Sequence, residues 1–168
     1  IKREVEEFKL QIHDLQFELA SDSKYHDIKI DDLFNIKKGK AEYTNKFITE
    51  NAGDYPLYSS QTKDEGVIGL INQYDYDCEA ITWTTDGIYA GTPFLRNGKF
   101  SMTTHCGALI LKDGIMDISL PYIYIFLRDN LRKYAIGEQN KRVTTNIIQN
   151  VHIPIPINAE GKFDLEVQ

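Results

Sequence analysis

The chain has 168 residues, of which 42% are hydrophobic, and a formal net charge of −6. This length fits one domain with an appendage. The chain contains no run of about 18 apolar residues, so we expect no transmembrane helix. The acidic balance argues against a generic nucleic-acid binder, which is normally basic. The charged first residues lack the apolar stretch of a secretory signal, so we expect a cytoplasmic protein.

Residues 3–20 show the periodicity of a helix with a heptad seam. Apolar residues recur on one side at spacings of three and four, as in coiled coils, and these are Val5, Phe8, Ile12, Leu15 and Leu19. Leu10 and Phe17 fall on the opposite side, and a helix that is apolar on two sides needs two neighbours. We expect residues 1–22 to form a helical spacer that contacts a partner helix. The alternative is an amphipathic helix packed on the chain's own core.

Short elements follow a polar break at residues 21–24. Residues 26–30 suggest a strand, and residues 31–34 suggest one helical turn capped by an aspartate. Residues 36–40 are expected to end in a loop. Between residues 55 and 112, runs suited to strands alternate with turns, as in a compact and mostly antiparallel β unit.

The last third of the chain predicts a second helix over residues 121–134, with Pro121 in its first turn and apolar positions at Ile125, Leu127, Leu131 and Tyr134. Asn146 is a candidate cap for a short helix. The two prolines within residues 151–157 exclude a helix and favour an extended edge. Residues 159–168 are expected to begin a further helix.

The chain lacks the motifs of common catalytic sites. It has no Gly-rich cofactor loop, P-loop or Gly-x-Ser-x-Gly elbow. The two cysteines, Cys78 and Cys106, are far apart in the sequence and form no CxxC motif. Asp75, Asp77 and Glu79 alternate as on one strand face, but no nearby lysine completes a nuclease set, and we expect a solvated face. We therefore expect no catalytic and no metal-binding residues.

Residues 82–107 are rich in threonine, glycine and aromatic residues. Their glycines interrupt runs suited to strands and permit the backbone angles of sharp reversals. This pattern predicts a rigid, irregular β surface with polar loops, which suits recognition better than bond-breaking chemistry. Trp83 lies within an apolar run, and we expect it to pack in the core.

Together with residues 55–62 (YPLYSSQT), 66–69 (GVIG) and 151–156 (VHIPIP), this stretch resembles the target recognition domain of type I restriction–modification specificity subunits. The resemblance covers about residues 26–168. It implies an α+β fold, in which a compact β-rich target recognition domain over residues 23–158 follows a long N-terminal coiled-coil-type helix. It also implies a non-catalytic module that reads one half of a split DNA target.

The resemblance implies double-stranded DNA and methyltransferase subunits as partners, and it leaves restriction subunits and self-association through the N-terminal helix open. The modification partner would be an adenine methyltransferase that uses S-adenosylmethionine, so this chain itself would hold no cofactor. Two alternatives remain: the C-terminal recognition domain of a single-chain restriction–methyltransferase, and a coiled-coil protein-interaction adaptor. The target bases do not follow from the sequence.

Side chains that match base edges fall in three loops and two locally basic segments. Arginine and lysine suit guanine, asparagine and glutamine suit adenine, and serine or threonine suits either. The candidate DNA contacts are Lys37, Lys38, Ser60, Gln61, Lys63, Thr85, Tyr89, Arg96, Gln139, Asn140, Lys141 and Arg142.

Overall fold

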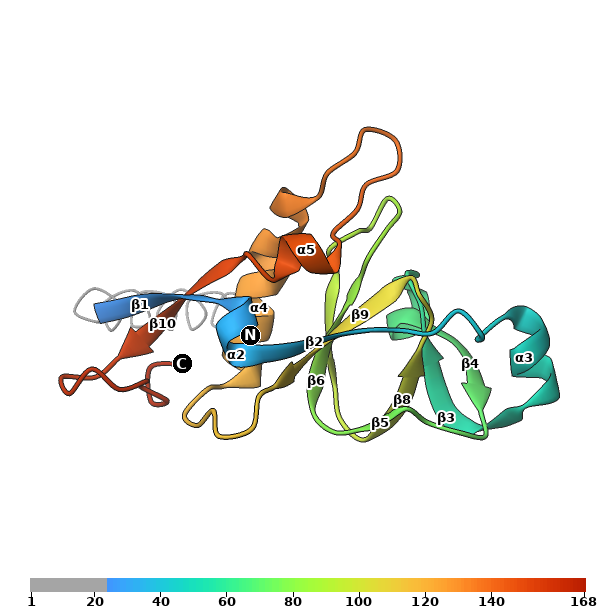
Figure 1. The fold of residues 1–168 in the computed structure, drawn as a ribbon, viewed down its shortest axis with the longest axis horizontal. Coiled ribbons are helices and arrows are strands. Elements are labelled where there is room, and N and C mark those ends of the chain that lie inside the picture. Colours follow the sequence, from blue (N-terminus) through green and yellow to red (C-terminus); the bar gives the residue numbers. More distant parts are fainter. Residues whose placement is uncertain (1–23) are drawn as a thin grey trace, which may run out of the picture.

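The computed structural model describes residues 24–168 (Figure 1). The expected helix over residues 3–20, with its seam of Val5, Phe8, Ile12, Leu15 and Leu19, lies outside the described residues. Along the described part the elements are β1 (Lys24–Lys29), α2 (Ile30–Leu33), β2 (Phe34–Lys38), α3 (Asn45–Glu50), β3 (Ala52–Tyr58), η1 (Lys63–Gly66), β4 (Val67–Ile71), β5 (Tyr76–Asp77), β6 (Ala80–Thr84), β7 (Pro93–Arg96), β8 (Lys99–Met102), β9 (Cys106–Leu111), α4 (Leu120–Asn130), η2 (Leu131–Tyr134), α5 (Thr145–Ile148) and β10 (His152–Ile157).

The strands form three small sheets that follow one another along the long axis of the molecule (Figure 1). The central sheet has the order β2-β9-β6-β7 and is antiparallel throughout. A second sheet has the order β4-β3-β8-β5, in which only β3 and β8 run parallel. The β1–β10 ribbon lies on the opposite side of the central sheet from the second sheet (Figure 1). The expected β-rich α+β fold is therefore confirmed, with mostly antiparallel strands between residues 52 and 111.

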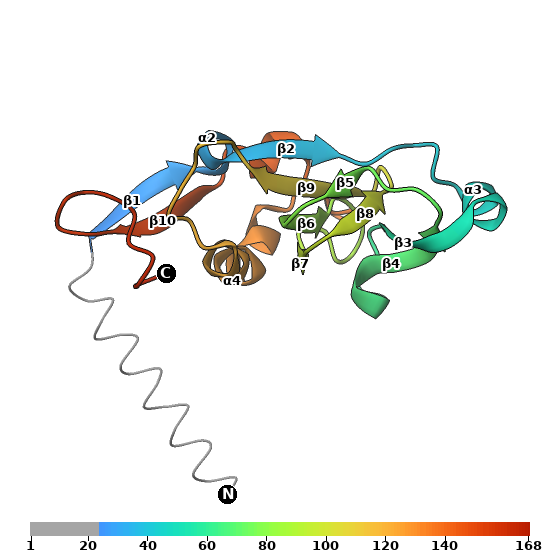
Figure 2. The ribbon, with the colours of Figure 1, turned by 90° about the horizontal axis from the view of Figure 1, so that it is seen from below.

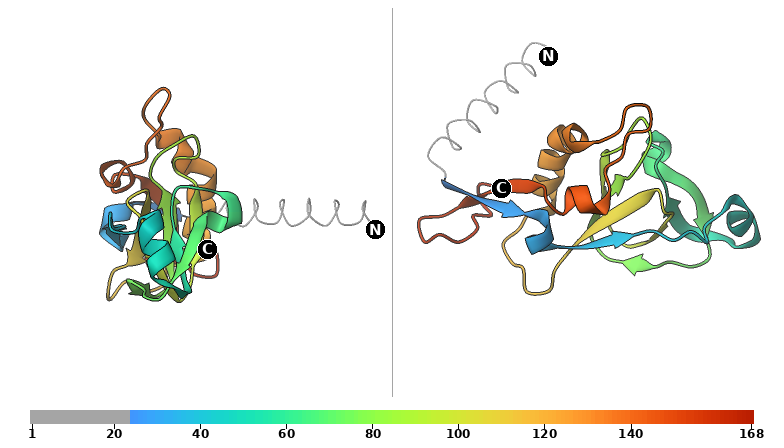
Figure 3. Two further views of the ribbon diagram at one scale, coloured as in Figure 1. Left: turned by 90° about the vertical axis from the view of Figure 1, so that its right-hand side faces the viewer. Right: turned by 45° about the horizontal axis from the view of Figure 1, so that its top comes forward.

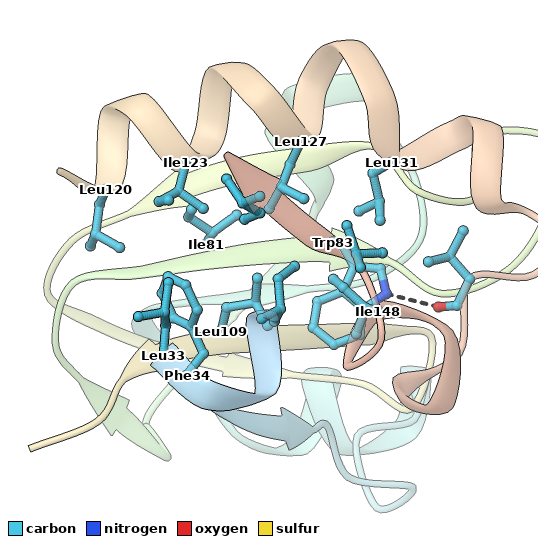
Figure 4. Packing of buried hydrophobic residues seen from close by; sticks show 14 of the residues in the cluster. Leu33, Phe34, Ile81, Trp83, Leu109, Leu120, Ile123, Leu127, Leu131 and Ile148 are labelled. Carbon is cyan, nitrogen blue, oxygen red and sulfur yellow. Dashed lines mark hydrogen bonds between the residues drawn. The ribbon is translucent and has the colours of Figure 1, made fainter. Parts of the chain in front are cut away.

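Helix α4 packs on one face of the central sheet (Figure 2). Its first turn contains Pro121 as expected, and the hydroxyl of Ser119 caps it by accepting from the amide of Tyr122 at 3.3 Å. The residues that the helix and η2 bury recur at spacings of three and four, and they are Leu120, Ile123, Leu127 and Leu131. They meet Ile81 and Trp83 of β6 (Figure 4). Burying each such side chain contributes roughly 1.5–3 kcal/mol to the stability of the fold. These residues belong to the main hydrophobic core cluster of the described residues.

Two apolar positions expected on this helix are exposed instead. Ile125 is 49% exposed, because the helical spacing that buries Leu127 and Leu131 places Ile123 on the buried face. Tyr134, the last residue of η2, is 42% exposed.

Strand β10 accommodates both of its prolines because their missing amides are not needed on its outer edge. The carbonyl of Pro154 accepts from the hydroxyl of Tyr122 on α4 at 2.5 Å. The carbonyl of Pro156 accepts from the amide of Asp164 at 2.9 Å. The predicted extended edge is confirmed, and these bonds join the ribbon to α4 and to the last turns of the chain.

Residues 36–38 belong to β2, and the strand ends before Gly39, so residues 36–40 end in a loop as expected. Three local expectations are wrong, and the first of them lies near the start of the described residues. The turn α2 begins at Ile30 with no side-chain cap. Its first amides, those of Ile30 and Asp31, donate instead to the carbonyls of Val151 (2.9 Å) and Gln149 (3.3 Å).

The other two corrections lie near the C-terminal end. Helix α5 has Thr144 as its N-cap, and Asn146 lies inside it. Residues 159–168 form turns where a regular helix was expected. The carboxamide oxygen of Asn158 accepts from the amides of Glu160 and Lys162, both at 3.0 Å, which holds this segment in a turn.

Candidate nucleic-acid interface

Two of the three predicted reading loops lie side by side at one end of the central sheet (Figure 1 and Figure 3). The first follows β6, and the second is the segment that leads into α5. The amide of Val143 donates to the carbonyl of Thr85 at 2.8 Å, and the amide of Gly87 donates to the carbonyl of Lys141 at 3.0 Å. Asp86 and Arg142 form an isolated antiparallel bridge between the loops. Two segments more than fifty residues apart in the sequence therefore form one surface.

The base of the second loop is rigid, and its tip is open to solvent. The buried indole of Trp83 donates to the carbonyl of Val143 at 2.8 Å (Figure 4). Ile136 and Arg142 exchange two backbone hydrogen bonds of 3.0 and 2.8 Å, which close the loop. Four of the predicted contacts in this loop are exposed: Gln139, Asn140 and Lys141 beyond the closing pair, and Arg142 within it. Trp83 packs in the core as predicted, and it also anchors this loop.

An open cavity of about 390 Å³ lies where these loops meet the ends of β2 and β9. Its lining combines two cations, several hydroxyls and one carboxylate, and consists of Lys38, Thr85, Asp86, Thr104, His105, Arg142, Thr144 and Thr145. Cations and hydroxyls of this kind bind phosphate oxygens and the edges of bases. The cavity thus brings together Lys38, Thr85 and Arg142 of the predicted contacts and adds residues that the sequence did not indicate.

Asp86 and His105 are the most specific feature of this cavity. The Nδ1 atom of His105 lies 2.9 Å from both carboxylate oxygens of Asp86, and the Thr85 hydroxyl donates to Asp86 Oδ1, also at 2.9 Å. The side chain of His105 is 57% exposed and that of Asp86 is 27% exposed. Thr84 of β6 pairs with Cys106 of β9. The residues that flank this pair must therefore meet, which is the signal that sequence reasoning missed.

Lys37 and Lys38 are both exposed, but they differ in their relation to the cavity. Successive side chains of a strand point to opposite faces. Lys38 lines the cavity, and Lys37 is not among its lining residues. Of the two lysines, Lys38 is the one that belongs to this surface.

The third predicted loop, residues 59–63, adjoins the cavity through Thr103. The Thr103 hydroxyl donates to the Ser59 hydroxyl at 2.9 Å and accepts from the amide of His105 at 3.3 Å. Ser60 is half-buried, whereas Gln61 and Lys63 are exposed. The side-chain amide of Gln61 donates to the carbonyl of Val67 within its own turn. Part of its hydrogen-bonding capacity is therefore already used.

Tyr89 lies at the tip of the loop after β6 and is 46% exposed. Its ring is 5.9 Å from the guanidinium of Arg132, which also donates to the carbonyl of Ile88 at 3.2 Å. Tyr89 therefore remains a candidate contact beside the cavity.

Arg96 is not part of the exposed surface, which corrects its prediction as a DNA contact. It is only 6% exposed, and its guanidinium carbon lies 3.6 Å from the ring centre of Tyr58 and 4.7 Å from that of Phe94. It donates to the hydroxyl of Thr82 at 2.9 Å and to the carbonyl of Glu65 at 2.5 Å. Burial lowers the pKa of this guanidinium, and the nearby Tyr58 opposes that shift. Arg96 therefore stabilises the turn at Glu65, which follows the third loop.

The expected solvated face is confirmed for Asp77 and Glu79, which are exposed, and is wrong for Asp75. Asp75 is half-buried, accepts from the hydroxyl of Tyr43 at 2.6 Å and forms an ion pair with Lys40. Within residues 24–168, no cluster of three or more His, Cys, Asp or Glu residues is arranged to hold a metal ion. In the same part of the chain, no helix is long and apolar enough to cross a lipid bilayer.

A β-rich α+β module that gathers basic and hydroxyl-bearing loops from distant segments around one cavity has the architecture of a recognition domain. This chain belongs to the family of the type I restriction modification DNA specificity domain, whose sequence model matches residues 22–168. The membership confirms the resemblance found in the sequence.

Two similar proteins are putative type I specificity subunits of Mycoplasma pneumoniae. One is 46% identical over 128 residues, which cover 76% of this chain and 34% of that protein. The other is 42% identical over 133 residues, which cover 79% of this chain and 54% of that protein. The chain thus spans about a third to a half of the length of these relatives.

Solved structures of S subunits share the fold. The S subunit of a type I restriction-modification system from M. genitalium superposes with a TM-score of 0.67 at 20% identity, covering 83% of this chain and 36% of that one. The HsdS subunit from Thermoanaerobacter tengcongensis gives 0.58 at 14% identity, covering 92% and 42%. At these identities the similarity concerns the fold.

Proposed function

We propose that this chain is the DNA-reading part of a type I restriction–modification specificity protein and recognises one half of a split duplex target. The observation that carries this proposal is the cavity, where Lys38 and Arg142 converge with the hydroxyls of Thr85 and Thr104. Such a surface offers charge to phosphates and hydrogen bonds to base edges. The relatives named above are specificity subunits, which favours this function over a single-chain restriction–methyltransferase or an adaptor.

The proposed module positions DNA and carries out no chemistry of its own. An adenine methyltransferase subunit would use S-adenosylmethionine to methylate the target, and such enzymes flip the target base. The cofactor would therefore belong to the partner. Purified chain that transferred labelled methyl groups to DNA would contradict this division of labour.

The proposed partners are double-stranded DNA, methyltransferase subunits and restriction subunits, and the proposed location is the cytoplasm. The apolar seam formed by Val5, Phe8, Ile12, Leu15 and Leu19 provides the candidate contacts with a partner helix, in another subunit or in a second copy. Replacing Ile12 and Leu15 with glutamate should reduce docking or self-association while leaving the β-rich domain folded. Unchanged mass in light scattering together with unchanged partner capture would contradict a contact through this seam.

The proposed DNA surface is tested by binding to target and scrambled duplexes across a salt series. We expect the Lys141→Ala/Arg142→Ala variant of the assembled protein to bind every sequence more weakly and to lower the salt slope by about 1–2 units, one per lost phosphate contact. If Arg142 reads guanine, its loss instead costs roughly 1–3 kcal/mol and relaxes preference at one base pair.

The matched control removes two other exposed lysines. Lys46 and Lys162 form surface ion pairs with Glu50 and Glu160, and neither lines the cavity. The Lys46→Ala/Lys162→Ala variant should keep both affinity and salt slope. Equal effects of the two double variants, or no effect of either, would place the DNA elsewhere on the molecule.

A further inference from the structure

His105 is held in one orientation by contacts to both its backbone and its ring. Its carbonyl accepts from the amide of Thr85 at 3.1 Å, and its amide donates to the hydroxyl of Thr103 at 3.3 Å. Its Nδ1 atom lies 2.9 Å from both oxygens of the Asp86 carboxylate, which itself accepts from the Thr85 hydroxyl. This is more support than a freely solvated histidine has, although the side chain is 57% exposed.

The pair fixes the hydrogen-bonding character of the other ring nitrogen. A carboxylate only accepts hydrogen bonds, so Nδ1 carries the hydrogen. In the neutral ring, Nε2 is then an acceptor with a lone pair. Among residues 24–168, no hydrogen bond to His105 Nε2 is found, whereas both oxygens of Asp86 are engaged.

The cations beside His105 differ from it in hydrogen-bonding character. Lys38 and Arg142 line the same cavity, and their side chains only donate hydrogen bonds. In the major groove such donors suit guanine and phosphate, whereas an acceptor suits the exocyclic amino group of adenine N6 or cytosine N4. The cavity thus combines groups of opposite preference within one recognition surface.

We propose that His105, oriented by Asp86, is a specificity-determining residue whose Nε2 accepts a hydrogen bond from the exocyclic amino group of an adenine or a cytosine. Asp86 acts as a positioning residue that keeps the hydrogen on Nδ1. This assignment rests on the proposed DNA-reading function and names one chemical class of base that the cavity selects.

The test uses the full-length protein in its native assembly and a pool of duplexes with a randomised segment, sequenced before and after binding. Binding is measured at about pH 8 and at about pH 5.5, because histidine is the side chain whose charge changes in the range between about pH 5 and 8. The charged groups that face His105 are Asp86, Lys38 and Arg142. Protonated His105 would donate from Nε2 and repel an amino group.

For the unaltered protein we expect enrichment of adenine or cytosine at one position at the higher pH. That preference should fall about fivefold to tenfold at the lower pH, as one base contact is lost, while the other positions keep theirs as internal controls. The identity of the enriched base distinguishes adenine from cytosine. Preferences that are independent of pH at every position would overturn the role of His105.

Two variants separate base reading from other roles. His105→Ala should abolish the preference at that one position at both pH values, and Asp86→Ala should weaken it at the higher pH. A uniform loss of affinity for all duplexes would make His105 a phosphate contact and overturn the proposal. If the unaltered protein enriches no sequence, the proposed DNA-reading function itself fails. The pH comparison on the unaltered protein is decisive even if a variant does not fold.

Discussion

Trp83 and Gly107 lie directly opposite each other in the β6–β9 pair, and the indole occupies the space above the glycine backbone. A Cβ atom at position 107 would lie 2.2 Å from Cη2 of Trp83. The same indole donates to the carbonyl of Val143. One close approach between two strands thus sets the position of the loop that carries Lys141 and Arg142.

Gly107→Ala should therefore destabilise the protein strongly. The ring is fully buried and cannot move aside, so the free energy of unfolding should fall by about 3 kcal/mol, at the upper end of overpacking effects. Gly98→Ala is the control, because nothing lies within 4 Å of its new Cβ and only its φ of 91° opposes the change. That variant should lose about 1 kcal/mol. Urea unfolding measures both, and equal losses would contradict the close approach.

Trp83→Phe should loosen the second loop more than it weakens the sheet. The phenyl ring leaves the Val143 carbonyl without its donor, so the amides of Arg142 and Val143 should exchange about tenfold faster relative to β9 amides. Phe34→Leu removes apolar volume from the same core cluster and does not touch this hydrogen bond. Its loop amides should keep the same ratio to the β9 amides. Hydrogen exchange followed by mass spectrometry decides between local and general loosening.

Arg96→Met should act on stability and leave direct phosphate contacts intact. The change removes the donors to Thr82 and Glu65 and the cation between the rings of Tyr58 and Phe94. We expect a loss of about 2–4 kcal/mol in the free energy of unfolding and an unchanged salt slope of DNA binding. Glu65→Gln, at an exposed residue 3.8 Å from the guanidinium, should cost less than about 1 kcal/mol. A lower salt slope in Arg96→Met would restore Arg96 as a phosphate contact.

Cys106 should make the protein less stable in alkali. Burial raises the pKa of its thiol from 9.0 to about 12. Because the folded-state pKa is the higher one, the stability that the neutral thiol contributes is fully present below pH 9 and is lost as the pH rises toward 12. The slope reaches up to about 1.4 kcal/mol per pH unit. Urea unfolding at several alkaline pH values should show a flatter profile for Cys106→Ala, whereas Cys78→Ala, at a half-buried thiol, should change it less. Identical profiles for all three proteins would contradict this role.

Local sequence patterns predicted the elements that depend on periodicity and turn residues. The strands between residues 52 and 111, helix α4 with Pro121 in its first turn, the proline-bearing β10 and the buried Trp83 all follow from such patterns. Local patterns failed where a distant segment supplies the partner. The amides of Ile30 and Asp31 at the start of α2 bond to carbonyls more than a hundred residues away, and no side chain caps this turn.

The same distinction applies to the site. The polar, turn-rich character of the two loops with Thr85 and Arg142 is visible in the sequence, but their contact depends on the β6–β9 register and on Trp83. Arg96 resembles any loop-adjacent cation in the sequence, and only the fold places it between two aromatic rings. The Asp86–His105 pair likewise becomes visible only when the two strands are aligned.

The most direct test of the central claim, that the surface around the cavity binds DNA, is a lysine-modification footprint of the assembled protein with and without its target duplex. Lys38 lines the cavity, Lys141 lies at the adjoining loop tip, and Lys46 and Lys162 are exposed outside the cavity lining. The account predicts that DNA protects Lys38 and Lys141 from modification and leaves Lys46 and Lys162 unchanged. Protection of Lys46 or Lys162 with undiminished modification of Lys38 and Lys141 would contradict it.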